Sequence, residues 1–185
     1  MTRDYRQLPD DVLRICHSVD APPRLVAHLT LVHDVAYQLL DRLEDEFPAL
    51  VLDRDAVIFG SATHDIGKSL HTSELSAPGR LHERDGAGLL SRFGATERLS
   101  RFTRTHANWG HDPEIAIEDL LVALADNCWK GKRVSELEER TVACLAEATG
   151  KASWEVFALL DDILQQAAKD ADARLAWQAQ FPATR

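Results

Sequence analysis

The chain has 185 residues, of which 45% are hydrophobic and 28% are charged, and its formal net charge is −9. This composition is typical of a globular chain with a substantial core and excludes a disordered one. The negative charge argues against binding to nucleic-acid backbones or to anionic membranes, so any phosphate group has to be bound by local cations.

The spacing of apolar residues is helical along nearly the whole chain, and no alternating run is long enough to predict a strand. We therefore expect an all-α fold, with proline, glycine and acidic residues at the ends of its helices. The last helix carries an apolar face that either packs on the core or pairs with a second copy of the chain as a homodimer. In chain order, the expected helices cover residues 9–17, 22–47, 53–69, 81–93, 96–107, 114–130, 134–149 and 152–180, and a loop covers residues 70–79.

The sequence also predicts a cellular compartment. Its longest strongly apolar run, residues 120–125, is too short to cross a membrane, and the first twenty residues contain no stretch that resembles a signal peptide. Cys16, Cys128 and Cys144 are widely spaced and form no CxxC pair. We expect a cytoplasmic protein with free thiols and without a zinc–thiolate site.

Two apolar segments end in side chains that need a partner. His64 and Asp65 follow the apolar or small residues 56–63, and Asp126 follows the six apolar residues LLVALA. Because an unpaired buried charge is costly, each needs a hydrogen bond, a counter-charge or a metal ion. A divalent ion would satisfy His64, Asp65 and Asp126 together. The alternatives are a buried hydrogen bond between His64 and Asp65 and a cation next to Asp126.

His28 lies on an apolar helical stripe with Leu25, Val32 and Val35, so it is either a core histidine or a ligand that points inward. His33 is about 140° away from it on the same helix, and we do not expect it to reach the same ion.

His82 and His106 lie near the ends of the two following helices. Imidazoles and carboxylates without thiolates suit iron, manganese, zinc or magnesium. Six such residues suit two ions about 3.5–4 Å apart that share a carboxylate, and Asp65 is the expected bridge. The candidate ligands are His28, His64, Asp65, His82, His106 and Asp126.

These residues resemble the H…HD…D signature of the HD-domain metal-dependent phosphohydrolases. The resemblance covers about residues 21–133 and rests on His28, on His64-Asp65 within HDIGK, and on Asp126 within ALAD. It implies one HD-type helical bundle over residues 1–185, with the metal-binding core at about 21–133 and a C-terminal helical pair at about 134–181. His28, His64, Asp65 and Asp126 would bind the first ion. Asp65, His82 and His106 would bind a second, as in the family's binuclear branches.

The resemblance implies hydrolysis of a small phosphate ester or anhydride, a nucleotide first of all, by a water that the metal activates. Asp65 and Lys68 would be the catalytic residues, and Lys68 would also bind the substrate phosphate. Apart from the resemblance, a second basic group, Lys130, Lys132 and Arg133, lies just beyond Asp126, and we expect Lys130 and Arg133 to bind the phosphate as well. A salt bridge is the alternative for Lys68, and a solvated helix end is the alternative for the other two cations. Glu74 and Glu83 are candidate general acids or bases, and position alone does not choose between them.

The sequence departs from some branches of the family and leaves two other functions open. No GYP tripeptide follows His106, which weighs against cyclic-di-GMP phosphodiesterases. Ile-Gly-Lys follows the dyad, in place of the acidic residues of the family's alarmone hydrolases and of some of its nucleotidases. The other functions are a di-iron oxygenase on the same fold and a non-catalytic, metal-stabilised binding module. Turnover that depends on oxygen would favour the first, and metal stabilisation without turnover the second.

Overall fold

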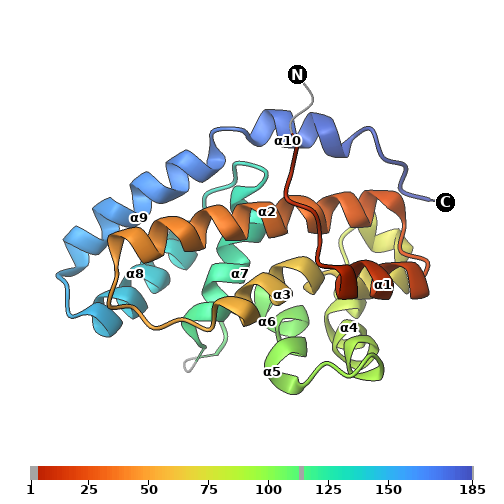
Figure 1. The fold of residues 1–185 in the computed structure, drawn as a ribbon, viewed down its shortest axis with the longest axis horizontal. Coiled ribbons are helices and arrows are strands. Elements are labelled where there is room, and N and C mark those ends of the chain that lie inside the picture. The colour runs from red at the N-terminus through yellow and green to blue at the C-terminus, as the bar shows by residue number, and fades with distance from the viewer. Residues whose placement is uncertain (1–3, 113–114, 185) are drawn as a thin grey trace.

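The computed structural model describes residues 4–112 and 115–184, and every regular element in that part of the chain is a helix (Figure 1). The all-α prediction is confirmed. The elements are α1 (Asp10–Ser18), α2 (Pro23–Glu46), α3 (Arg54–Thr63), the 3-10 turns η1 (Ile66–Ser69) and η2 (Thr72–Leu75), α4 (Leu81–Arg92), α5 (Glu97–Ser100), α6 (Phe102–Asn108), α7 (Ile117–Cys128), α8 (Ser135–Thr149), α9 (Ser153–Ala168) and α10 (Ala171–Gln178).

The long helix α2 runs through the middle of the fold, with α9 and α10 along one side and α3 and α7 along another (Figure 1). It begins with Pro23 at its first position, where proline costs no hydrogen bond, and ends just before Pro48. Apolar side chains on its buried faces join the main core, so α2 fixes the position of every residue that it carries.

α7 is apolar on nearly all sides, and residues 119–125 are all buried. α7 packs against α2, α3, α6 and α8, which explains why no polar face is needed at its centre. Its last turn carries Asp126, which therefore emerges from the core beside α2 and α3.

The helix expected over residues 53–69 is shorter, because α3 ends at Thr63 and a 3-10 turn begins at Ile66. Asp53 caps its start by accepting a hydrogen bond from the Ala56 backbone N–H at 3.1 Å. At its end, Asp65 leaves helical geometry, with φ −101° and ψ 8°. Gly67 in the turn lies so close to α4 that a Cβ there would be 2.2 Å from the His82 carbonyl oxygen.

Three further boundaries correct the sequence prediction. The helix expected over 96–107 is divided into α5 and α6 around Arg101, where an i→i−3 bond from Arg104 N–H tightens the turn. The helix expected over 152–180 is divided at residues 169–170, so that α10 can turn and pack against α2. The loop over 70–79 contains η2. The expected start of the helix over 114–130 lies partly outside the described residues, and α7 begins at Ile117.

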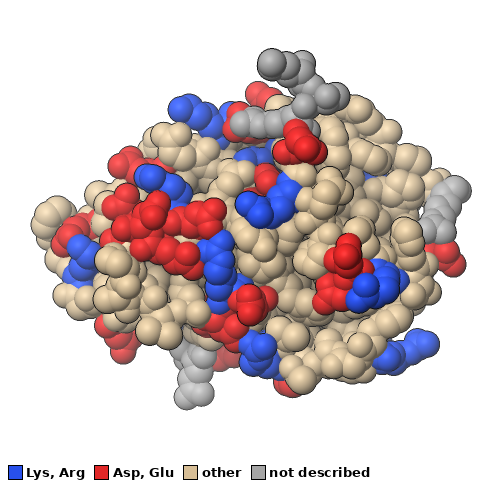
Figure 2. Space-filling model, in the orientation of Figure 1, with Lys and Arg blue, Asp and Glu red and all other residues tan. Residues whose placement is uncertain are grey.

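Figure 2 shows acidic side chains gathered over the part of the surface where α2 and α9 run, in keeping with the net charge of −9. On α2, Asp41 and Glu44 pair with Arg54. A search of the described helices finds none that is both long enough and apolar enough to span a bilayer.

Candidate metal centre

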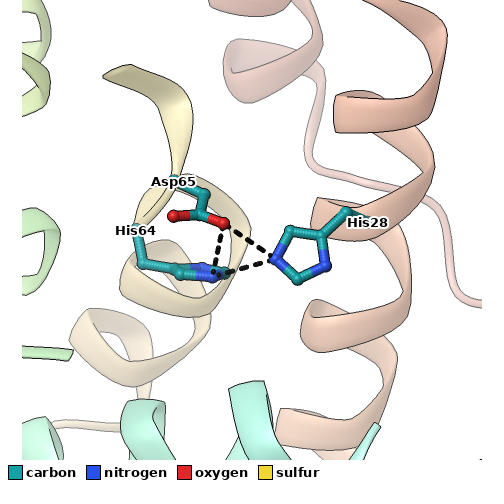
Figure 3. Close-up of side chains that lie close together, drawn as sticks. All are labelled: His28, His64 and Asp65. Atoms are coloured by element: carbon teal, nitrogen blue, oxygen red, sulfur yellow. Dashed lines mark hydrogen bonds and ion pairs between the residues drawn. The ribbon is translucent and has the colours of Figure 1, made fainter. Parts of the chain in front are cut away.

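Three helices bring the first group of candidate ligands together. His28 projects from α2, His64 and Asp65 stand at the end of α3, and Asp126 comes from the last turn of α7. Figure 3 shows the His28 and His64 rings and the Asp65 carboxylate turned toward one another. Neighbouring residues of a regular helix point about 100° apart, so the end of α3 between His64 and Asp65 helps both to reach the same point.

The atoms of this group have the separations of ligands around one ion. His28 Nε2 is 3.2 Å from His64 Nε2, 3.1 Å from Asp65 Oδ2 and 3.4 Å from Asp126 Oδ1. His64 Nε2 is 3.7 Å from Asp65 Oδ2 and 3.5 Å from Asp126 Oδ1. Two ligand atoms about 2.1 Å from one tetrahedral ion are themselves about 3.4 Å apart. His28, His64 and Asp65 therefore have the geometry of a group that could hold one divalent ion, and Asp126 Oδ1 lies beside both imidazole nitrogens.

The second oxygen of Asp65 faces a different pair of histidines. Asp65 Oδ1 is 3.1 Å from His82 Nε2 on α4 and 3.6 Å from His106 Nε2 on α6. The Asp65 carboxylate is 4% exposed and thus lies between two ligand groups, with one oxygen directed to each. This is the arrangement of a carboxylate shared by two ions.

The hydrogen bonds behind the rings fix which nitrogen faces the centre. His64 Nδ1 donates to the Ser61 carbonyl oxygen at 3.1 Å, and His106 Nδ1 donates to the Phe102 carbonyl oxygen at 2.9 Å. A carbonyl oxygen only accepts, so each Nδ1 carries a proton, and Nε2 is the nitrogen turned toward the carboxylate oxygens of the centre.

His82 follows the same pattern with a carboxylate behind it. Its Nδ1 is 2.5 Å from Glu74 Oε2, while its Nε2 and Asp65 Oδ1 are buried atoms without a hydrogen bond among the described residues. A histidine held from behind by a carboxylate is the usual support of a metal-binding imidazole. The chemistry of the donors therefore fits divalent metal ions, with imidazole and carboxylate ligands and no thiolate.

The centre lies at the wall of a cavity of about 550 Å³, which is lined by His28, Asp65, His82, His106 and Asp126 and by a surrounding set of polar and aromatic residues. A cavity of this size is typical of small-molecule sites.

The HD domain family model matches residues 25–129, which is more than half of the chain. The chain belongs to the HD-domain family. The matched segment contains all six candidate ligands, and their two buried clusters are consistent with the metal site of this superfamily of metal-dependent phosphohydrolases. No curated protein and no solved structure matches the chain.

The electrostatics of this HD domain favour positive charge at the centre. Burial disfavours the ionised form of Asp65, but His64, His28, His82 and Lys68 outweigh it and hold its pKa well below the ordinary value. Burial likewise opposes a proton on His82, but Asp65 and Glu74 outweigh it and raise the pKa of that imidazole. Burial and the nearby charge of His64 lower the pKa of His106 to about 4, because Asp65 and Asp126 do not outweigh them. Asp65 thus stays ionised, as a metal ligand must be.

The cations predicted to bind phosphate differ in where the structure places them. Lys68 lines the cavity and its Nζ lies 2.5 Å from Asp65 Oδ2, so the salt bridge left open by the sequence is present. Lys130 also lines the cavity, with its Nζ 4.0 Å from Asp126 Oδ2. Arg133 does not line the cavity. Its guanidinium donates hydrogen bonds to the Glu138 and Asp161 carboxylates, each at 2.7 Å.

Sequence reasoning missed several residues around the cavity. Arg24, Trp109, Trp129 and Gln178 line it and were not predicted as site residues. Only Arg24 had a usable signal, since it lies four residues before His28 and therefore on the same helical face. His33 stays apart from the site as expected, because it packs against Tyr37 with a 5.1 Å separation between ring centroids.

The structure also separates the two candidate acids. Glu74 is bound to His82 Nδ1 and to the backbone N–H groups of Leu81 and His82. Glu83 lines the cavity and is buried, and it accepts a hydrogen bond from Asn108 Nδ2 at 2.7 Å. Glu74 is therefore a positioning residue, whereas Glu83 faces the space that a substrate would fill.

Proposed function

We propose that this HD domain hydrolyses a small phosphate ester or anhydride, with nucleotides as the first class to test. His28, His64, Asp65 and Asp126 would hold one divalent ion, and Asp65, His82 and His106 would hold a second. The metal is iron, manganese, zinc or magnesium by the choice of ligands. When bound, such ions polarise phosphoryl oxygens and lower the pKa of water to near neutrality.

One observation carries this proposal: Asp65 presents one oxygen to each ligand group, and Lys68 touches the same carboxylate from inside the cavity. In a chain with a net charge of −9, a phosphate needs a cationic site that the overall charge does not supply. Metal ions next to Lys68 and Lys130 provide one. The same cavity would then contain both the ions that neutralise the phosphate charge and the lysines that bind the phosphate.

The chain's own residues have distinct tasks in this proposal. Lys68 contacts the Asp65 carboxylate. With the charge of that carboxylate neutralised by bound metal, the Lys68 ammonium group would be available to bind a phosphoryl oxygen. Lys130, one helical turn after Asp126, binds a second oxygen of the same group. Glu83 would pass a proton to or from the reacting oxygens, since it is buried at the cavity wall, where Asn108 and Arg80 contact its carboxylate.

The test is elemental analysis of protein purified without chelator, together with phosphate release from a panel of nucleotides. Asp65→Ala should lose both ions and lower turnover by at least about 100-fold, since it removes a ligand of each group. Asp162→Ala is the matched control, because Asp162 is exposed on α9. Full turnover by Asp65→Ala would overturn the proposed centre.

The same assay separates the two other functions. Turnover that stops under argon would point to an oxygenase and contradict hydrolysis. A melting temperature that rises with added metal, without phosphate release from any nucleotide, would instead indicate a binding module.

A further inference from the structure

The cavity contains four cationic side chains, and they fall into two pairs. Lys68 and Lys130 each face a carboxylate of the proposed metal centre, Asp65 and Asp126 respectively. Arg24 and Lys132 line the same cavity, and across residues 4–112 and 115–184 no carboxylate oxygen lies within 4.0 Å of the side-chain nitrogens of either residue. The positive charge of the second pair is therefore uncompensated within a strongly acidic chain.

Arg24 is held in place by the other end of the described chain. Its Nε donates to the Phe181 carbonyl oxygen at 3.2 Å, and its backbone N–H donates to the Pro182 carbonyl oxygen at 3.0 Å. Anchoring through Nε fixes the plane of the guanidinium and leaves its two terminal nitrogens available. A guanidinium fixed in this way binds an oxyanion through two parallel hydrogen bonds at a reduced cost in side-chain entropy.

Arg24 and Lys132 come from chain positions outside the segment that carries the candidate metal ligands. Arg24 precedes His28 by four residues on α2, which is about 6 Å along the helix axis. Lys132 follows the last turn of α7, beyond Lys130, and Gln178 of α10 lines the cavity as well. All three lie outside the matched segment 25–129. This part of the cavity wall is thus supplied by the chain's flanking segments.

We propose that Arg24 and Lys132 form a second anion subsite, which binds a phosphate group of the substrate other than the one that is cleaved. This rests on the proposed function and narrows it to substrates with two separated phosphate groups. Lys68, Lys130 and the metal ligands take the reacting phosphate, and the subsite selects the substrate by its second charge. A lone phosphate would leave Arg24 and Lys132 without a counter-charge in a cavity of about 550 Å³.

The test compares adenosine 3′,5′-bisphosphate with adenosine 5′-monophosphate, which differ by one phosphate. Calorimetry on the metal-loaded protein gives Kd for each, and phosphate release gives KM. The wild-type chain should bind the bisphosphate at least about tenfold more tightly, as expected for one charge-assisted pair of hydrogen bonds. Arg24→Gln should bring the ratio of the two Kd values close to one, and Lys132→Gln should reduce it about threefold.

Controls keep the result interpretable. Arg42→Gln removes an exposed arginine of the same helix that pairs with Glu46, and should keep the wild-type ratio. Within the described part of the chain the Lys132 side chain makes no hydrogen bond or ion pair, so Lys132→Gln tests the subsite even if Arg24→Gln disturbs the fold through Phe181. Equal Kd values for the two nucleotides in the wild type, or an unchanged ratio in both variants, would overturn the subsite.

The outcomes also distinguish the subsite from the proposed function. A chain that prefers the bisphosphate through Arg24 but releases no phosphate from any nucleotide would keep the subsite and reject hydrolysis. Hydrolysis of the monophosphate without any preference for the bisphosphate would support hydrolysis and reject the subsite.

Discussion

The contact between Glu74 and His82 determines which nitrogen of that imidazole faces the second ligand group. Glu74 Oε2 lies 2.5 Å from His82 Nδ1, and the same oxygen accepts the His82 backbone N–H at 3.2 Å. Both contacts keep the ring turned so that Nε2 points at Asp65. Glu74 thus acts on the centre through His82 rather than by touching a substrate.

Glu74→Gln should therefore weaken the second ion selectively. The amide accepts from the backbone but lacks the charge that makes His82 a stronger donor to metal, so affinity for that ion should fall about 10–100-fold. The first ion should be retained, because none of its four ligands touches Glu74. Metal content measured over a titration of free metal checks this. Glu97→Gln, at an exposed residue that pairs with Arg104, is the control. Equal loss of both ions would contradict a role confined to His82.

The residues of the centre were predictable because of where they stand in the sequence. Histidines and carboxylates within apolar runs, such as His64 and Asp126, are conspicuous in any helical chain. The sequence pattern does not predict the contacts of the arginines. Arg133 contacts Asp161, 28 positions away, and Arg24 contacts Phe181, 157 positions away, so only the folded chain shows that Arg133 is held outside the cavity and that Arg24 is anchored at its wall.

The end of α3 is the element on which the geometry of the centre depends. Gly67, in the 3-10 turn after it, lies against the backbone of α4, where an added Cβ would be 2.2 Å from the His82 carbonyl oxygen and 2.9 Å from the Gly86 nitrogen. Backbone atoms cannot give way as a flexible side chain can. Any larger residue must therefore separate the turn that follows Asp65 from the helix that carries His82.

Gly67→Ala should destabilise the fold by about 1–3 kcal/mol and lower the occupancy of the second ion. Gly88→Ala is the matched control: Gly88 lies on α4 with no atom within 4 Å of its added Cβ, and it should stabilise the chain by about 0.5–1 kcal/mol. Urea unfolding and metal content measure the two effects. A Gly67→Ala chain with wild-type stability and both ions bound would show that α4 is not held at this distance.

Helix periodicity predicted the elements better than their ends. Residues 56–63 are apolar or small, and nothing local marks Thr63 as the last residue of α3. The close approach of Gly67 to α4 is a tertiary contact, and so is the buried Arg174 on α10, which donates to the Ala167 carbonyl oxygen across the break between α9 and α10. Such contacts override local helical propensity. The domain limits at 21–133 and 134–181 stay a prediction.

α2 carries two histidines that lie in different surroundings. His28 reaches the cavity, whereas His33 is 2% exposed in the interior, and neither of its ring nitrogens has a hydrogen bond in the described chain. Burial lowers the pKa of His33 to about 4, and the nearby charges of Arg6 and Asp34 act on it in opposite directions. His33 is therefore neutral in the folded protein at physiological pH.

This makes the fold sensitive to acid in a defined window. The unfolded chain takes up the proton of His33 near pH 6.5, whereas the folded chain does so only near pH 4. The stability contributed by neutral His33 is present above about pH 6.5 and is lost as the pH falls toward 4. Between pH 7 and pH 4.5 this amounts to about 2 kcal/mol of unfolding free energy.

His33→Leu should flatten the pH profile of stability by that amount, because leucine fills the buried position without a group to protonate. Urea unfolding at pH 7 and pH 4.5, with and without the substitution, gives the difference directly. His17→Leu is the control, since His17 is exposed on α1. The comparison isolates His33 from the histidines of the metal centre, which are unchanged in both variants. Profiles of wild type and His33→Leu that run parallel would mean that His33 takes up its proton equally well in the folded chain, contrary to its burial.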